Sequence, residues 1–242
     1  MCGVLRPSVW GRDVVRSEWF GCACCPSNLC RFTASIPGYI YAHHDDKLYV
    51  NLYIQGTGEI DMPGGMVRLT QTTEMPWQGA VSIKVDETTG NNYSMMLRLP
   101  GWANGAPVPS DLYSYVDSKK ADIVVKINGK DTSYEMQDGY MVINRKWTVG
   151  DLVSFELPMD IRMVAANELV EADLGRMALE RGPFVYCIES PDNANVNSCY
   201  LTESATVRPV WTDALNGLMK LNISQKNAYE GENTMTAIPY YA

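Results

Sequence analysis

The sequence predicts a mainly β protein, in which a short helical segment precedes two antiparallel β-sandwich-like domains. Three observations indicate this class. Apolar side chains recur at helical spacing in residues 26–36, short alternating strands fill residues 47–158, and a new strand-rich stretch begins near residue 159. No long helical pattern separates the strands, and this absence favours antiparallel sandwiches over a parallel sheet.

The helical segment begins at Pro26, a residue suited to the first helical position because proline has no backbone N–H to leave unpaired. Its apolar and small side chains recur three or four residues apart, at Leu29, Phe32, Thr33 and Ile36. We expect Pro37 and Gly38 to end or kink this helix.

The period changes to two in residues 47–54, KLYVNLYI, which predicts the first strand. One face of that strand would carry Leu48, Val50, Leu52 and Ile54. Further strands are predicted at residues 66–71, 80–86, 93–100, 122–127, 140–145 and 152–158. Tight turns are expected at residues 127–129 (ING) and 138–140 (DGY). These patterns, with the resemblance given below, divide the chain at residues 1–45, 46–160 and 161–242.

The bulk composition excludes some classes of function. The 242 residues carry a formal net charge of −8, which argues against binding to a nucleic-acid phosphate backbone. No apolar run approaches the length needed to cross a bilayer, and the first 13 residues contain no apolar stretch of signal-peptide length. The sequence assigns neither a cellular location nor an oligomeric state.

The seven cysteines are unevenly distributed. Four of them lie within nine positions, at Cys22, Cys24, Cys25 and Cys30, and the others are Cys2, Cys187 and Cys199. A disulfide framework spreads its cysteines, whereas a crowded cluster is typical of a metal or reactive-thiol site. Cys187 lies in the apolar run FVYCIE, which indicates a buried, inert thiol.

A cysteine acts as nucleophile or metal ligand only as the thiolate. Lowering a thiol pKa from about 8.5 to below 7 requires roughly 2 kcal/mol, whereas a helix N-terminus supplies about 0.3–1 kcal/mol. Zinc deprotonates a coordinating thiol outright and is the stronger candidate cause. Because the chain has no second ligand pair at zinc-site spacing, the visible ligand set is incomplete. A cluster of partly buried thiols without function remains the alternative.

Other candidate residues give weaker signals. His43 and His44 lie beside the first strand, where a solvated turn is favoured over a catalytic or ligand role. The glycine-rich stretch at residues 55–65 has no following Lys-Ser/Thr and indicates turns rather than a phosphate loop. Four tryptophans suggest either a sugar-stacking platform or, as favoured here, packing: Trp77, Trp102, Trp147 and Trp211.

Several segments in order carry a family resemblance. They are WFGCACCPSNLCRFTASIPGYIY (residues 19–41), LYVNLYI, EMPWQGAVSIKV, LRLPGWA and GRMALERGPFVYCIE. Together they resemble the β-L-arabinofuranosidase-like enzymes of glycoside hydrolase family 127 over nearly the whole chain. The Cys-Cys-Pro-x-Asn motif that begins at Cys24 is the most specific of them.

The resemblance implies an (α/α)6 catalytic barrel followed by two β-sandwich domains, with residues 1–45 forming the end of the barrel. It further implies that Cys24 is the nucleophile of a retaining glycosidase and a zinc ligand, and that Cys25 is a second zinc ligand. A Glu-x-Cys pair would complete the zinc site, and a separate glutamate would act as acid/base.

No Glu-x-Cys sequence occurs in these 242 residues. The resemblance therefore implies the C-terminal part of a longer enzyme, with a truncated last domain, that releases arabinofuranose from plant-type glycans. On its own the chain is expected to be inactive and to bind zinc weakly or not at all. The alternative is a non-catalytic β-sandwich module that binds carbohydrate or supports a partner domain.

Overall fold

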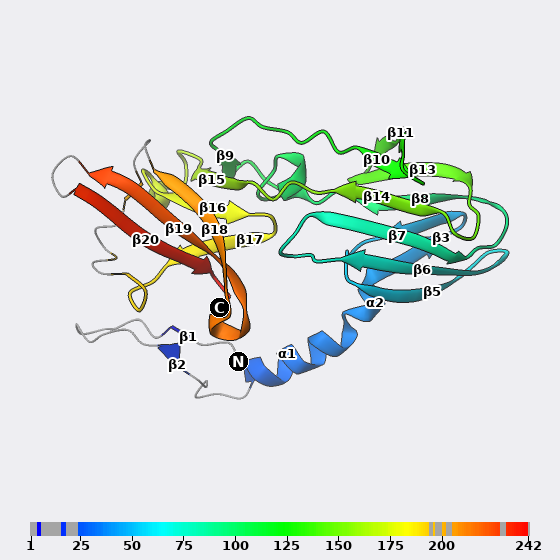
Figure 1. The fold of residues 1–242 in the computed structure, drawn as a ribbon, viewed down its shortest axis with the longest axis horizontal. Helices are drawn as coiled ribbons and strands as arrows, with labels where there is room; N and C mark the ends of the chain where they lie inside the picture. Colours follow the sequence, from blue (N-terminus) through cyan, green and yellow to red (C-terminus); the bar gives the residue numbers. More distant parts are fainter. Residues whose placement is uncertain are drawn as a thin grey trace.

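A computed structural model describes residues 4–5, 16–17, 24–193, 196, 200–201, 205–227 and 231–241 of the chain. Cys2, Cys22 and Cys199 lie outside these residues. The predicted fold class is confirmed, because the described chain is mainly β with several antiparallel sheets and few helices (Figure 1).

The N-terminal part contains a two-stranded pair, β1 (Val4–Leu5) with β2 (Arg16–Ser17), and two helices, α1 (Cys24–Ser35) and α2 (Pro37–Ile40). Helix α1 begins two residues before the predicted start, so Pro26 is its third residue; proline is tolerated there because the first-turn N–H groups have no intrahelical partner. The expected interruption is confirmed, since Pro37 opens the separate α2.

Two sheets face each other in what we call the first unit. Within the described residues their strand orders are β12-β13-β8-β4-β3 and β11-β10-β14-β7-β6-β5. All neighbouring strands are antiparallel except β4 and β8. The first sheet consists of β3 (Tyr41–His44), β4 (Lys47–Val50), β8 (Asn92–Arg98), β12 (Glu135–Gln137) and β13 (Tyr140–Lys146). The second consists of β5 (Gly56–Met62), β6 (Gly65–Thr73), β7 (Ala80–Glu87), β10 (Val125–Ile127), β11 (Lys130–Thr132) and β14 (Leu152–Glu156).

The core of the first unit lies between these sheets and is formed by alternate side chains of the strands. Leu48 and Val50 are fully buried, as the alternation predicts. The prediction was wrong beyond Val50, because β4 ends there. Tyr53 turns inward instead and donates to the Arg98 carbonyl at 2.5 Å, while Ile54 is 40% exposed.

The prediction that residues 55–65 form only turns was also wrong. Residues 56–62 form β5, and only the short segment around Gly64 turns the chain into β6. The other two turns are confirmed. Both residues of Asn128-Gly129 and of Asp138-Gly139 have positive φ, which is the signature of the tight hairpin turn expected at each place.

In the second unit, the described strands form one sheet of order β18-β19-β20-β17-β16-β15-β9. These strands are β9 (Tyr113–Tyr115), β15 (Ile161–Ala166), β16 (Met177–Arg181), β17 (Phe184–Ile188), β18 (Thr206–Thr212), β19 (Leu218–Asn227) and β20 (Gly231–Pro239). Strand β9 precedes β10 of the first unit in sequence but pairs with β15. Short helical turns are η1 (Gly101–Asn104), η2 (Glu171–Asp173) and η4 (Ala214–Asn216). The predicted domain limits remain a prediction.

Figure 1 shows the two units side by side, with α1 below the sheets and the loop after β9 running above them. Aromatic rings join the units: Trp77, in the loop after β6, lies 4.8 Å from Phe184 of β17 and 5.7 Å from Trp211 of β18, between ring centroids. None of the helices in the described segments is long and apolar enough to cross a membrane.

Candidate functional site

The predicted nucleophile and zinc ligands, Cys24 and Cys25, are the first two residues of α1. Their side chains are exposed, and their two Sγ atoms are 3.8 Å apart. Two sulfurs bonded at about 2.3 Å to one tetrahedral zinc ion stand about 3.8 Å apart. The helical start thus brings two neighbouring thiols to the spacing that one metal ion requires.

Hydrogen bonds within α1 fix the polar groups near this pair. Ser27 Oγ donates to the Cys24 carbonyl at 3.1 Å, and Arg31 Nη2 donates to Asn28 Oδ1 at 2.6 Å. These contacts hold Ser27, Asn28 and Arg31 on the first two turns, so the Cys-Cys-Pro-x-Asn segment has a defined local structure.

The apolar stripe of α1 is exposed in the described part of the chain. Leu29 and Phe32 are each 54% exposed, and no residue of α1 is buried. Phe32 meets only the ring of Tyr39, at 6.4 Å between centroids, among the described aromatic pairs. The helical spacing of the stripe was predicted correctly, and no described residue buries it.

The remaining predicted thiols are separate from the pair or lie outside the described residues. Cys30 is exposed on the same helix. The family resemblance gives no role to Cys30 or to Cys22, and Cys22 is outside the described residues. Cys187 was expected to be buried but is half-buried in β17, where its Sγ donates to Glu189 Oε1 at 3.6 Å.

The described residues contain no group of three His, Cys, Asp or Glu side chains that could hold a metal ion. His43 and His44 lie exposed at the end of β3, and His44 Nδ1 is 3.3 Å from Asp45 Oδ2. The structure therefore brings Cys24 and Cys25 together and does not add a histidine to them.

The tryptophans do not form one platform. Trp147 is fully buried in the first unit and donates from Nε1 to the Tyr93 carbonyl at 3.1 Å. Trp77 and Trp211 contact each other between the units. Trp102, half-buried on η1, lines two cavities.

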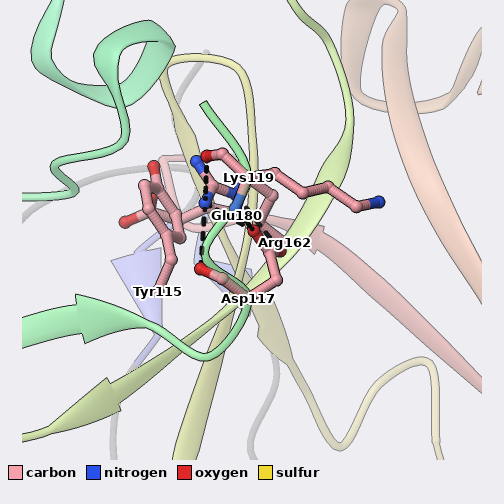
Figure 2. A network of polar contacts seen from close by, with 5 residues as sticks. All are labelled: Tyr115, Asp117, Lys119, Arg162 and Glu180. Carbon is pink, nitrogen blue, oxygen red and sulfur yellow. Dashed lines mark hydrogen bonds and ion pairs between the residues drawn. The ribbon is translucent and has the colours of Figure 1, made fainter. Parts of the chain in front are cut away.

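One of these, which we call the junction cavity, was not predicted from the sequence. It has a volume of about 240 Å³, and its main polar and aromatic walls are Trp102, Tyr115, Lys120, Asp160, Arg162 and Glu180. Figure 2 shows the network at its wall. Arg162 Nη2 donates to Asp117 Oδ1 at 2.6 Å and to the Lys119 carbonyl at 3.1 Å, while the Lys119 side chain extends away.

The guanidinium of Arg162 also lies 3.4 Å from the centre of the Tyr115 ring, and the Tyr115 hydroxyl donates to Glu180 Oε2 at 2.7 Å. Hydrogen bonding from Arg162 lowers the pKa of Asp117. Burial raises the pKa of Glu180, and the hydrogen bond from Tyr115 and the charge of Arg162 offset this only in part. No sequence motif marks these residues, because β9, β15 and β16 bring them together only in the folded sheet.

Comparison with known proteins gives two family matches. The sequence model described as "Beta-L-arabinofuranosidase, GH127 middle domain" matches residues 47–159, and that of the glycoside hydrolase family 127 C-terminal domain matches residues 161–242. A curated relative, the non-reducing end β-L-arabinofuranosidase of Bifidobacterium longum subsp. longum, is 35% identical over 185 residues. That match covers 74% of this chain and 25% of the relative.

Comparison with solved structures gives the same family as the sequence models. A GH127 β-arabinofuranosidase superposes with a TM-score of 0.83 at 40% identity, covering 93% of this chain and 37% of its own. A GH127 β-L-arabinofuranosidase from Geobacillus stearothermophilus T6 has a TM-score of 0.78 at 32% identity, covering 94% and 36%. This chain thus spans about a quarter of the length of the curated relative and just over a third of the solved chains. With two domain models matched in order over most of its length, the chain belongs to glycoside hydrolase family 127.

Proposed function

We propose that this chain is part of a retaining, β-L-arabinofuranosidase-like glycoside hydrolase that acts on arabinose-containing glycans, with Cys24 as nucleophile. The observation that carries the proposal is the pair of thiols with sulfurs 3.8 Å apart at the start of α1, in a chain of this family. The names of the relatives support the substrate class.

The Cys24 thiolate would attack the anomeric carbon of a terminal arabinofuranose, so that a C–S bond forms as the glycosidic C–O bond breaks. The leaving oxygen takes a proton from an acid/base group, expected to be a glutamate outside these residues. Water then attacks the same carbon, its proton passes to the acid/base group, and the C–S bond breaks to restore the thiolate. Two inversions at one carbon give net retention.

Cys24 and Cys25 fit zinc, because both offer sulfur and their spacing matches one tetrahedral ion. When bound, zinc would keep the sulfurs deprotonated at neutral pH.

A test uses the complete polypeptide that contains this chain and a chromogenic β-L-arabinofuranoside. We expect Cys24→Ser to abolish hydrolysis, because a serine hydroxyl is not ionised at neutral pH, while Cys30→Ser on the same helix retains it. NMR of the first-formed sugar should show the β anomer. Full turnover by Cys24→Ser, or an α product, would remove Cys24 from the nucleophile role.

The 242-residue chain alone is proposed to be inactive and to bind zinc weakly, since two thiolates are half of a tetrahedral shell. Elemental analysis after dialysis should find well under one zinc per chain, and less still in Cys24→Ser and Cys25→Ser. One zinc per chain would contradict the proposal and indicate further ligands within these residues.

A further inference from the structure

The junction cavity shares no residue with the cysteine pair. Its walls come from η1 and the end of the first unit on one side, and from β9, β15 and β16 on the other. In Figure 1, β9 and β15 lie at the top of the second unit, whereas α1 lies below the sheets. Clefts between units are a frequent place for ligand sites, so the cavity is a separate candidate from the catalytic thiols.

Two polar groups at the cavity wall have unused hydrogen-bonding capacity. Glu180 Oε2 accepts from Tyr115, but Oε1 accepts from no described residue. Nε and Nη2 of Arg162 donate hydrogen bonds to Asp117, and Nη2 also donates to the Lys119 carbonyl. Nη1 donates to none of the described groups. A carboxylate oxygen and a guanidinium nitrogen are thus held in place, and both line one cavity.

The same contacts hold these groups rigidly. The Arg162 guanidinium forms an ion pair with Asp117 along one edge and stacks on the Tyr115 ring, and only 12% of the Arg162 side chain is exposed. Tyr115 in turn fixes the Glu180 carboxylate. A ligand that binds here would meet groups already in position and would not have to order them.

The half-buried Trp102 lines the same cavity. An aromatic ring provides a large, rigid apolar surface beside the polar pair. A ligand that suits the ring and the polar pair needs an apolar face together with neighbouring groups that donate to a carboxylate and accept from a guanidinium. Hydroxyl groups do both, and a sugar ring offers adjacent hydroxyls and a C–H face.

The charges around the cavity balance. Asp160 and Glu180 are matched by Lys119 and Lys120, and Arg162 is paired with Asp117, so the cavity carries no net charge that would select an anion or a cation. The described residues contain no acidic, histidine or cysteine trio to bind a divalent cation. At about 240 Å³ the cavity is smaller than the roughly 300–1,000 Å³ typical of sites for larger ligands.

We propose that the junction cavity is a binding site for a single uncharged sugar residue, held by Glu180 and Arg162 and stacked on Trp102. This site goes beyond the proposed function, because it needs neither the thiols nor turnover. It would hold a sugar of a glycan at a distance from the bond being broken.

The test is calorimetric and ligand-observed NMR titration of the 242-residue chain with L-arabinose, methyl β-L-arabinofuranoside and D-galactose. Inorganic phosphate and D-glucuronate serve as charged comparators. We expect at least one neutral sugar to bind with a Kd on the order of 1 mM, and more tightly than either anion. Absence of saturable binding by all three neutral sugars to the folded chain, or tighter binding of phosphate or glucuronate, would overturn the proposal.

Variants locate the binding. Glu180→Gln keeps the size of the side chain and should weaken binding about tenfold, the value of one charge-assisted hydrogen bond. Trp102→Ala should weaken it at least as much, and melting temperatures show whether that variant folds. If Trp102→Ala does not fold, the sugar affinity of Glu180→Gln alone tests the proposed site.

The matched control is Glu135→Gln, exposed on the edge strand β12, which should keep the wild-type Kd. Cys24→Ser should also keep it, so that failure of the catalytic proposal and failure of this one are distinguishable. Unchanged affinity in Glu180→Gln would place any sugar binding elsewhere and overturn the assignment.

Discussion

Glu180 is a carboxylate that the fold half-buries in the wall of the junction cavity. Burial raises its pKa above the ordinary value of about 4.3, even though the Tyr115 hydroxyl and Arg162 act in the opposite direction. A raised folded pKa means that the fold favours the protonated form. Its contribution to stability is therefore present at low pH and is lost as the pH rises through the folded pKa.

We expect Glu180→Gln to be at least as stable as the wild-type chain at pH 7.5, because the amide has no charge to desolvate. The difference in melting temperature should shrink as the pH is lowered through the titration of Glu180. Thermal denaturation by circular dichroism at pH 7.5, 5.5 and 4 measures this. A clear loss of stability at pH 7.5 would mean that the hydrogen bond and ion pairing outweigh burial.

Higher stability of Glu180→Gln, combined with weaker sugar binding, would also bear on the role of the cavity. A side chain whose replacement increases stability but decreases ligand binding is retained for the ligand. Glu180 would then differ from Asp117, whose lowered pKa comes from the Arg162 hydrogen bond and which serves to position Arg162.

At the scale of an element, the connection from β13 to β14, which passes from one sheet of the first unit to the other, is held in place by Asp151. This side chain is 4% exposed; Oδ2 accepts from the Thr148 backbone N–H at 2.9 Å, and Oδ1 accepts from Asn128 Nδ2 at 2.8 Å. Asn128 Oδ1 then accepts from the Leu152 N–H at 2.9 Å. One carboxylate thereby joins the turn before β14 to the turn between β10 and β11.

We expect Asp151→Ala to lower the free energy of unfolding by about 2 kcal/mol, because two part-buried hydrogen bonds to the Asp151 carboxylate are lost. Urea denaturation at pH 7 checks this. The control is Asp131→Asn, a 74% exposed residue 3.7 Å from Lys126 Nζ, whose loss should change stability by well under 1 kcal/mol. Equal losses in the free energy of unfolding for the two variants would show that the hydrogen bonds of Asp151 contribute nothing to stability.

The pH dependence of Asp151 runs opposite to that of Glu180. Burial raises the pKa of Asp151, but hydrogen bonds from Thr148 and Asn128 and the charge of Arg145 together outweigh it, so the pKa is lowered. The stability gained is complete above about pH 4 and is lost as the pH falls through the lower folded pKa. The stability difference between wild type and Asp151→Asn should therefore be constant at neutral pH and narrow only below about pH 4.

Strand patterns were readable from the sequence where one face is buried, as at Leu48 and Val50, and the glycine turns were readable because Asn128 and Asp138 precede glycine. Strand β5 was missed because its glycines suggest turns. The structure gives the reason for one of them: a Cβ on Gly58 would lie 2.2 Å from Tyr41 Cε2, so a close ring contact, and not a turn, requires this glycine.

The sites, like the strands, could be predicted only where the pattern is local in the sequence. The cysteine pair was found because its two residues are adjacent in sequence and carry a distinctive chemistry. The junction cavity was not, since Asp117 and Arg162 are 45 residues apart and Tyr115 and Glu180 are 65 apart. No motif marks any of these residues, and they become neighbours only because β15 pairs with β9 on one side and with β16 on the other.

At the scale of the whole molecule, the junction cavity depends on how firmly the two units are joined. Trp77 packs on Phe184 and on Trp211, and Arg181 Nη1 donates to the Trp77 carbonyl at 3.0 Å. Aromatic pairs contribute about 0.5–1.5 kcal/mol each beyond their buried area. The contacts of Trp77 therefore couple the units by an amount on the order of 2 kcal/mol.

We expect Trp77→Ala to separate the unfolding of the two units, so that a single thermal transition becomes two in calorimetry. A double-mutant cycle with Phe184→Ala should give a coupling energy of about 0.5–1.5 kcal/mol. The control is Tyr49→Ala, which removes a ring 5.2 Å from Tyr140 within the first unit and should lower stability without dividing the transition. Because the cavity walls come from both units, Trp77→Ala should also weaken binding of the neutral sugar, although Trp77 does not line the cavity. A single, merely lower transition with unchanged sugar affinity would show that other contacts hold the units together.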